Sequence, residues 1–106
     1  MLLSDQDFLS IIKFTPLVSI DLLLKNSDDE YLLGRRLNKP AKDFWFVPGG
    51  RIQKLEKMQD AFKRLVNEEL GFDFNMSDAK FLGPWEHFYS ENFFNKENVD
   101  THYIVL

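Results

Sequence analysis

The sequence predicts an α+β domain in which helices pack against a mixed β-sheet. Two segments, at about 5–13 and 56–70, carry apolar residues at helical spacing. The remaining apolar segments are short and rich in aromatic and β-branched residues, which is typical of strands. A chain of 106 residues with 44% hydrophobic content can build one small core, and it contains no repeat or linker, so we expect a single domain over 1–106.

The N-terminal part predicts a helix followed by a central strand. Ser4 is a suitable N-cap for a helix that runs to about Lys13, and Pro16 prevents its continuation. Residues 17–24 alternate in side-chain direction, yet both faces are mostly apolar, so we expect a strand buried within the sheet. Asp21 is the exception, an acid among apolar neighbours.

The next segments predict a hairpin and a short strand. A polar turn at 26–29 leads into a second strand at 30–37, which we expect to pair with 17–24. Residues 44–47 are aromatic and β-branched and end at Pro48. Gly49 and Gly50 then predict a turn where the backbone can approach a ligand closely.

The second helix is expected from Glu56 to Leu70, with Gly71 as its terminator. At 100° per residue its apolar side chains form one stripe, and Glu69 falls near the centre of that stripe. Because a carboxylate there needs a partner, the pattern predicts a cation near Glu69. Strands are expected at 80–90 and 101–106.

Charge and composition exclude several classes of protein. The net charge of −4 argues against nucleic acid as a general partner, since phosphate contacts need a basic surface. No apolar run reaches the length that spans a bilayer, and no signal peptide is recognisable. The absence of cysteine excludes disulfides and fits a reducing compartment, so a cytoplasmic location is the simplest expectation.

Basic residues are nevertheless concentrated around the glycine pair. Between residues 35 and 57 there are seven basic residues against two acidic ones. This segment is either an ordinary solvated surface or the site of a small anion such as a pyrophosphate. The basic residues are Arg35, Arg36, Lys39, Lys42, Arg51, Lys54 and Lys57.

The central stretch resembles the Nudix box, G-x5-E-x7-R-E-U-x-E-E-x-G-U, where U is a bulky apolar residue. The match covers residues 50–72 and departs at one fixed position, Leu65, where the family has Glu. The matching residues are Gly50, Glu56, Arg64, Val66, Glu68, Glu69, Gly71 and Phe72. Eight fixed positions at the right spacing form a specific signal. The resemblance implies an α/β/α sandwich with a mixed sheet.

Within that family, the whole chain is similar to the GDP-mannose mannosyl hydrolases. The segments that carry this likeness are FWFVPGGR (44–51), TPLVSID (15–21), LLGRR (32–36), HFY (87–89) and THYIVL (101–106). The resemblance implies Mg²⁺-dependent hydrolysis of GDP-mannose, or GDP-glucose, at the sugar's anomeric carbon, with Mn²⁺ as the other candidate ion. A carbon-attacking enzyme needs its GDP leaving group neutralised more than it needs many metal ligands, so Leu65 would simply be core.

Residue roles follow from the same resemblance. It implies that the carbonyl of Gly49 and the carboxylate of Glu69 contact the metal. Arg36 and Arg51 would bind the diphosphate. For Arg64 an ion pair with Glu68 at i+4 is the favoured interpretation. The remaining implied contacts are Asp21 and His87 with the sugar, Tyr103 with the diphosphate, and Leu2, Leu3 and Phe8 with the guanine.

The resemblance also implies parts that this sequence does not contain. In the family, a third metal ligand, Gln, and the general-base His beside it follow the position of Leu106, and His102 does not replace them. We therefore expect an incomplete domain. A homodimer is a further family expectation. Two alternatives stay open: a nucleoside-diphosphate-sugar pyrophosphatase that attacks phosphorus, and a non-catalytic module that binds a GDP-sugar or metal.

Overall fold

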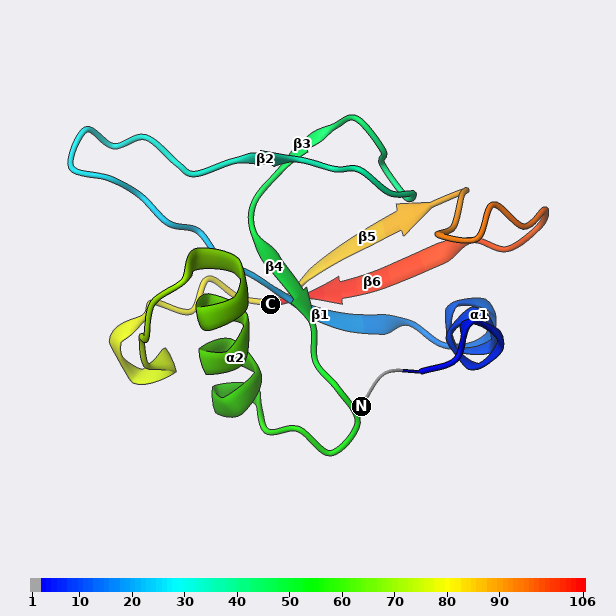
Figure 1. Cartoon of the computed structure of the whole chain (residues 1–106), viewed down its shortest axis with the longest axis horizontal. Helices are drawn as coiled ribbons and strands as arrows, with labels where there is room; N and C mark the ends of the chain where they lie inside the picture. The colour runs from blue at the N-terminus through cyan, green and yellow to red at the C-terminus, as the bar shows by residue number, and fades with distance from the viewer. Residues whose placement is uncertain (1–2) are drawn as a thin grey trace.

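The computed structural model describes residues 3–106, so Leu2 lies outside the described residues. The described chain folds into helices packed against a mixed sheet (Figure 1). In chain order the elements are α1 (Asp5–Phe14), β1 (Leu17–Asp21), β2 (Gly34–Arg35), β3 (Trp45–Phe46), β4 (Gly49–Arg51), α2 (Met58–Leu70), the 3₁₀ turn η1 (Met76–Asp78), β5 (Trp85–Tyr89) and β6 (Thr101–Val105).

The main sheet has four strands in the order β4-β1-β6-β5. β1 runs parallel to β6, while the β1–β4 and β5–β6 pairs are antiparallel, so the sheet is mixed. The strand with two apolar faces, β1, is central as predicted, because only a strand covered on both faces can bury both sets of side chains. The predicted α+β class and the mixed sheet are confirmed.

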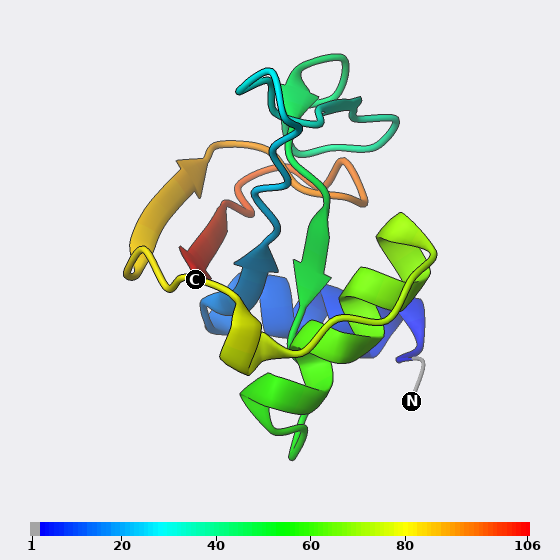
Figure 2. The ribbon, with the colours of Figure 1, turned by 90° about the vertical axis from the view of Figure 1, so that its left-hand side faces the viewer.

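Two apolar clusters lie on opposite faces of this sheet. On one face, Ile20 packs with the α2 residues Ala61, Leu65 and Val66. On the other, Leu17 packs with Ile12 of α1 and with Val99. Side chains alternate along a strand, so Leu17 and Ile20 of β1 point to opposite sides. Figure 2 shows the same arrangement, with α1 behind the strands and α2 in front of them. We call the side that α2 covers the α2 face, and the other side the site face.

The ends of both helices follow from local sequence. The Ser4 hydroxyl accepts a hydrogen bond from the Asp7 N–H, which caps α1 as predicted. At the end of α2, Gly71 adopts φ 78° and its N–H reaches the carbonyls of Asn67 and Val66. This left-handed conformation costs glycine little, so the predicted stop is confirmed.

The predicted hairpin between 17–24 and 30–37 is confirmed only next to its turn, and the predicted pairing of its two long strands is wrong. β1 ends at Asp21. The returning chain pairs beyond that end, through a bridge between Lys25 and Tyr31 and backbone hydrogen bonds of 2.9 Å on either side of it. β2 instead pairs with β3 in a separate two-stranded sheet (Figure 1). The neighbours of β1 are β4 and β6, which come from much later in the chain. A local sequence pattern cannot reveal pairing between such distant segments.

The predicted turn at Gly49 and Gly50 is also wrong, because both residues belong to the edge strand β4. They need to be glycine for a packing reason. Gly49 has φ 158°, and a Cβ there would meet the carbonyl oxygen of Ile20. A Cβ on Gly50 would lie 2.6 Å from the Leu65 side chain. The two glycines therefore let β4 lie close to both β1 and α2.

The second helix begins at Met58, two residues later than predicted, and its apolar stripe is buried only in the middle. Ala61, Leu65 and Val66 are buried, whereas Met58 is 54% exposed. Glu69 is exposed too, so its predicted place in the centre of a buried stripe is wrong. The core supports the middle turns of α2, and in the last turn Leu70 still packs against the core while Glu69 faces solvent.

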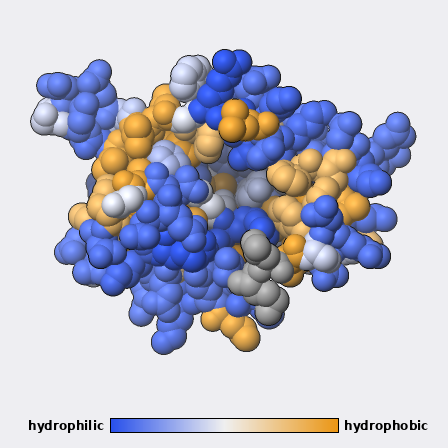
Figure 3. Space-filling view, viewed as in Figure 1, coloured by the Kyte–Doolittle hydropathy of each residue, from blue (hydrophilic) through white to orange (hydrophobic). Residues whose placement is uncertain are grey.

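The surface of the described chain mixes polar and apolar areas. In the view of Figure 3, hydrophobic side chains gather in two areas, with hydrophilic side chains between them.

Neither α1 nor α2, the α-helices of residues 3–106, combines the length and apolar content that crossing a membrane requires.

Candidate functional site

Residues from four strands meet on the site face. Tyr103 of β6 pairs directly with His87 of β5. Arg51 of β4 pairs with Ser19 of β1, and Ser19 points to the same face of the sheet as Asp21. The β1–β6 register places Tyr103 on the same side of the sheet as Asp21. Because paired residues point to the same face, the side chains of Asp21, Arg51, His87 and Tyr103 project together.

These residues also influence one another electrostatically. Burial raises the pKa of Tyr103, while the charges of Arg36 and Arg51 oppose that rise. Loss of hydration raises the pKa of Asp21, although part of its side chain stays exposed, and the nearby His87 opposes this rise. Two arginines thus lie within electrostatic reach of Tyr103, and Asp21 and His87 lie within reach of each other.

Arg51 is positioned by the N-terminal helix. Its guanidinium lies over the Phe8 ring of α1, 4.1 Å from the ring centroid, which is a close cation–π contact. Phe8 also contacts the rings of Phe93 and Phe94. Leu3, which the sequence also assigns to the guanine, is 39% exposed and is therefore accessible to a ligand. The arrangement joins Phe8 and Arg51 at one end of the site face.

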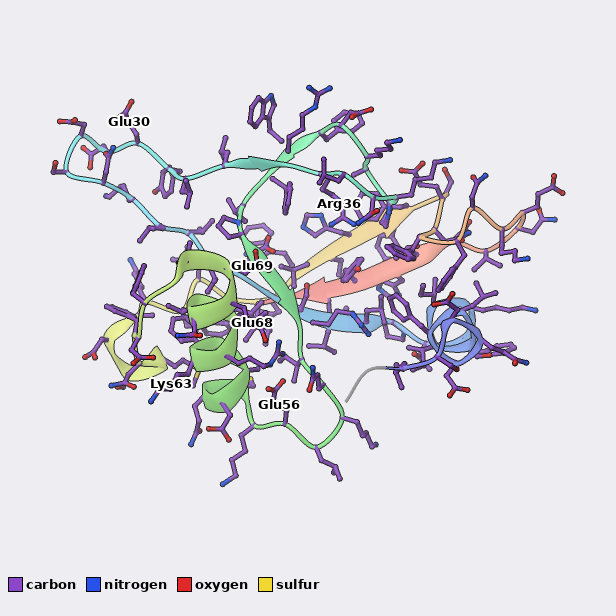
Figure 4. The ribbon with its side chains drawn as sticks, viewed as in Figure 1. Glu30, Arg36, Glu56, Lys63, Glu68 and Glu69 are labelled. Atoms are coloured by element: carbon purple, nitrogen blue, oxygen red, sulfur yellow. The ribbon has the colours of Figure 1, made fainter. Side chains whose placement is uncertain are left out.

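Arg36 reaches the site from outside the four-stranded sheet. It follows β2, and in Figure 4 its label lies above β5 and β6. Its Nε donates to the carbonyls of Asn38 at 3.1 Å and Pro40 at 2.6 Å, and its guanidinium lies 5.6 Å from the Phe46 ring centroid. Among the described residues, no hydrogen bond uses its two terminal nitrogens, which remain available for an anion.

The box arginine, Arg64, holds β4 and α2 together. Its Nη1 contacts Glu68 at 3.2 Å, which confirms the predicted i+4 pair. Glu56 makes the shorter contacts, 2.8 Å to Nε and 3.0 Å to Nη2, and the Arg51 carbonyl accepts from Nη2 at 2.9 Å. The Glu56 contact was missed because Glu56 was predicted inside the helix, where a residue eight positions away is out of reach.

The register of β4 against β1 sets the direction of the Gly49 carbonyl, one of the implied metal contacts. Leu22 and Ile52 make ladder hydrogen bonds with Pro48 and Val18, so the residues between them alternate in direction. Gly49 therefore points its carbonyl away from β1, as Arg51 does. The Arg51 carbonyl meets α2 at Arg64. Figure 1 shows α2 running opposite to β4, so the Gly49 carbonyl faces the later turns of α2.

Those later turns carry Glu68 and Glu69. Figure 4 shows both beside β4, on the flank of α2 opposite Lys63. Glu68 is engaged by Arg64, and Glu69 is exposed. A carbonyl and a carboxylate are the oxygen ligands that Mg²⁺ prefers, so these residues fit such an ion. Within residues 3–106, no group of three or more His, Asp or Glu side chains lies together in a way that could hold a metal ion.

His102 lies on the wrong side of the sheet to serve this site. It alternates with Tyr103 along β6, so it points to the α2 face. Its ring stacks on Phe88 with centroids 4.3 Å apart. It also lines a cavity of about 330 Å³ at the end of α1, formed with Ile12, Lys13, Phe14, Thr15, Pro16, Asn98, Val99 and Asp100. The His102 side chain thus lies on the opposite side of the sheet from Tyr103.

Sequence reasoning missed two residues near the site. The Tyr89 ring lies near those of His87 and Tyr103, at centroid distances of 6.4 and 6.5 Å. The β-alternation of His87 and Tyr89 was a signal for this placement. Glu91 contacts the loop that holds Arg36, through the backbone N–H of Ala41. Nothing local to the sequence could reveal a contact between residues that lie 50 positions apart.

Comparison with known proteins gives the family. The sequence profile of the NUDIX domain matches residues 15–106. The chain is 40% identical over 102 residues to the "Low-salt glycan biosynthesis protein Agl8" of Haloferax volcanii, covering 95% of this chain and 62% of that protein. It is 32% identical over 76 residues to the "m7GpppN-mRNA hydrolase NUDT17" of Danio rerio, covering 68% of this chain and 25% of that protein.

A solved structure shows the same fold. The MutT/nudix family protein from Enterococcus faecalis aligns with a TM-score of 0.57 at 17% identity, covering 99% of this chain and 49% of that one. The chain therefore spans only part of the length of the proteins it matches. The strand–helix geometry around Gly50 and Arg64 and the profile match over 15–106 together show that this chain belongs to the Nudix domain family.

Proposed function

We propose that this chain carries the active-site face of a GDP-sugar hydrolase, which converts GDP-mannose or GDP-glucose to GDP and free sugar by attack at the anomeric carbon. The observation that carries the proposal is the burial of Leu65. It is 2% exposed and packs against Gly50, so the family's acid is replaced by a core residue. The site thus has few carboxylates and several cations, which suits departure of an anionic diphosphate.

In the proposed reaction a water oxygen forms a bond to the anomeric carbon. The bond from that carbon to the β-phosphate oxygen breaks, and its electron pair leaves with GDP. Arg36 and Arg51 stabilise the charge that develops on the diphosphate, since a guanidinium stays charged and binds phosphate oxygens in pairs. When bound at Gly49 and Glu69, Mg²⁺ or Mn²⁺ would add positive charge to the same leaving group.

The other site residues would orient the substrate. Asp21 and His87 lie together on the site face and can hydrogen-bond sugar hydroxyls. Tyr103 lies within electrostatic reach of Arg36 and Arg51, and we propose that its hydroxyl contacts the diphosphate. Phe8, with Leu3 nearby in sequence, offers an apolar surface to the guanine, and Leu2 is proposed for the same role from sequence alone. The water's proton goes to a general base, a role that the family resemblance assigns to a His other than His87 and His102.

The sugar part of the proposal has support from one relative. The Haloferax volcanii protein is named for glycan biosynthesis. This likeness covers 95% of the present chain. It favours a nucleotide-linked sugar as substrate over other nucleotide derivatives.

The bond that breaks is tested by hydrolysis of GDP-mannose in ¹⁸O-labelled water with Mg²⁺. Attack at carbon places the label in the free sugar, and mass spectrometry of both products detects it. Label in the nucleotide product would refute the proposal. It would support the second candidate, a pyrophosphatase that releases GMP and sugar phosphate. The exposed carboxylate of Glu69 favours this candidate, because a phosphorus-attacking enzyme needs carboxylates to hold metal ions.

Binding is measured separately from turnover, because the implied base is not among these residues. Calorimetry with GDP-mannose and Mg²⁺ is expected to show binding that Arg51→Ala weakens. Binding without turnover would favour a non-catalytic GDP-sugar module. Sedimentation of the same polypeptide tests the homodimer that we also propose from the family resemblance.

A further inference from the structure

The hairpin that carries Arg36 has little support of its own. β2 and β3 are two residues each and pair only with each other. Figures 1 and 2 both show this hairpin standing away from the four-stranded sheet. An isolated two-stranded hairpin is at best marginally stable in water. If Arg36 is to bind a diphosphate, its side chain therefore needs support from outside the hairpin.

The first part of that support is the loop 37–42, which closes around the Arg36 side chain. The Arg36 N–H donates to the Phe44 carbonyl at 3.0 Å, and the Asp43 N–H donates to the Arg36 carbonyl at 2.9 Å. These two backbone hydrogen bonds close the base of the loop. The Arg36 side chain then folds back over the loop, and its Nε donates to the carbonyls of Asn38 and Pro40. The direction of the guanidinium thus depends on the conformation of the loop.

The second part comes from the loop 90–100, between β5 and β6. A Glu91 carboxylate oxygen accepts a short hydrogen bond from the N–H of Ala41, the residue next to Pro40. This contact is partly buried. Lys39 Nζ also donates to Asn95 Oδ1 at 2.8 Å, in a solvent-exposed contact. Glu91 makes the stronger link, since a charged and partly desolvated acceptor binds more tightly than a neutral exposed one.

Loop 90–100 is itself firmly built, so it can serve as a fixed support. Asn92 is fully buried, and its amide donates to the carbonyls of Lys96 and Val99, each at 2.8 Å. Its side-chain oxygen accepts from the N–H groups of Phe94 and Lys96, each at 3.1 Å. The Thr101 hydroxyl donates to the Glu91 carbonyl at 2.6 Å. The backbone of Glu91 is therefore tied directly to the main sheet.

We propose that Glu91 is a positioning residue for Arg36. Its carboxylate holds the loop 37–42 through Ala41, and the loop carbonyls then hold Nε so that the terminal nitrogens face the substrate diphosphate. The inference rests on the proposed function for the role of Arg36, while the contact chain from Glu91 to Arg36 stands on the structure. Glu91 itself does not touch the substrate in this arrangement.

The contact chain is tested first without any ligand. In ¹⁵N-labelled protein the Arg36 Nε–H is expected to exchange slowly with solvent, because two carbonyls accept from it. Glu91→Ala should speed this exchange and shift the Ala41 amide resonance. Glu91→Gln keeps an oxygen acceptor and should restore much of both signals. Glu97→Ala, an exposed acid in the same loop, is the matched control and should change neither. Unaltered Arg36 exchange in Glu91→Ala would overturn the proposal.

The functional consequence is tested by calorimetry with GDP and Mg²⁺. Loss of a hydrogen bond to a charged group is expected to weaken GDP binding about tenfold in Glu91→Ala, with Glu91→Gln within about threefold of the parent protein. In an Arg36→Ala background, Glu91→Ala should change affinity by less than about twofold, because a residue that acts through another loses its effect when that partner is absent.

The outcomes separate the two proposals. An equal effect of Glu91→Ala in both backgrounds would show that Glu91 acts by general stability and would overturn its positioning role. If the parent protein binds no GDP, the proposed function fails, and the Arg36 exchange measurement still decides whether Glu91 controls the loop.

Discussion

Arg51 and Arg36 are proposed for the same task, yet they are held in opposite ways. Arg51 belongs to a strand of the main sheet, with Phe8 beneath its guanidinium and Arg64 bonded to its carbonyl. Arg36 follows a two-residue strand outside that sheet, and side-chain contacts between two loops fix its loop. One arginine is part of the core structure, and the other is attached to it.

This difference shows how one small domain can combine a fixed and an adjustable half-site. Contacts around Arg51 involve the core strands and α2, whose opening requires much of the domain to unfold. Contacts around Arg36 can break while the core stays intact. We therefore expect variants near Arg51 to lower global stability, and variants near Arg36 to change only local order and binding.

The largest effect is expected for Leu65→Ala, which removes core packing under β4. Leu65 is 2% exposed and contacts Gly50, so its truncation should cost about 2–5 kcal/mol in the free energy of unfolding. Chemical denaturation measures this loss. Met58→Ala, on the same helix at 54% exposure, is the control and should cost far less. Equal losses would show that α2 does not pack as described.

A smaller effect is expected when Arg64 loses one partner. Glu56 is 15% exposed and makes two contacts with Arg64, so Glu56→Ala should cost about 1.5–3 kcal/mol. Glu68 is 56% exposed, and Glu68→Ala should cost about 0.2–1 kcal/mol. Denaturant titration of the two variants compares them directly. A larger loss for Glu68 would contradict the assigned hydrogen bonds.

The same pair predicts a pH dependence. The hydrogen bond from Arg64 lowers the pKa of Glu56 in the folded state. This contribution to stability is present above the pKa of the unfolded chain and is lost as pH falls through the lower, folded pKa. Glu56→Ala should therefore lose less stability than the parent protein on acidification, which thermal unfolding across the acidic range measures.

Hydrogen exchange tests the comparison amide by amide. The N–H groups of Leu22 and Ile52 make 2.8 Å bonds to β-ladder partners, and those of Arg36 and Asp43 make bonds of 3.0 and 2.9 Å. Despite the similar lengths, we expect the hairpin amides to exchange about 10- to 100-fold faster, because local opening exposes them. Equal protection in an NMR exchange experiment would show that the hairpin unfolds only with the core.

The smallest effect concerns Asp21. Loss of hydration raises its folded pKa, so the folded state binds the proton more tightly than the unfolded state does. The resulting penalty is absent below the ordinary carboxyl pKa and grows until the pH exceeds the raised value. Asp21→Asn should remove it, so the variant gains stability relative to the parent as pH rises through that window. A constant difference between the two unfolding curves would contradict the raised pKa.

Local patterns predicted the elements whose causes are local. Ser4 and Gly71 set helix ends correctly, because a cap is made within a few residues of the helix terminus. The Arg64–Glu68 pair follows from helical spacing alone. The strand partners of β1 were mispredicted, because β4 and β6 lie far along the chain from it.

By itself, the sequence determined that this is a small α+β domain of the Nudix type, with an apolar residue at position 65 and cations beside a glycine pair. Those features depend on residue type and short spacing. Only the tertiary structure decided that the two glycines form an edge strand, that Glu69 is exposed, and that Glu91 holds the loop of Arg36. Each of these depends on which distant segments meet, and the packing of the whole chain sets those meetings.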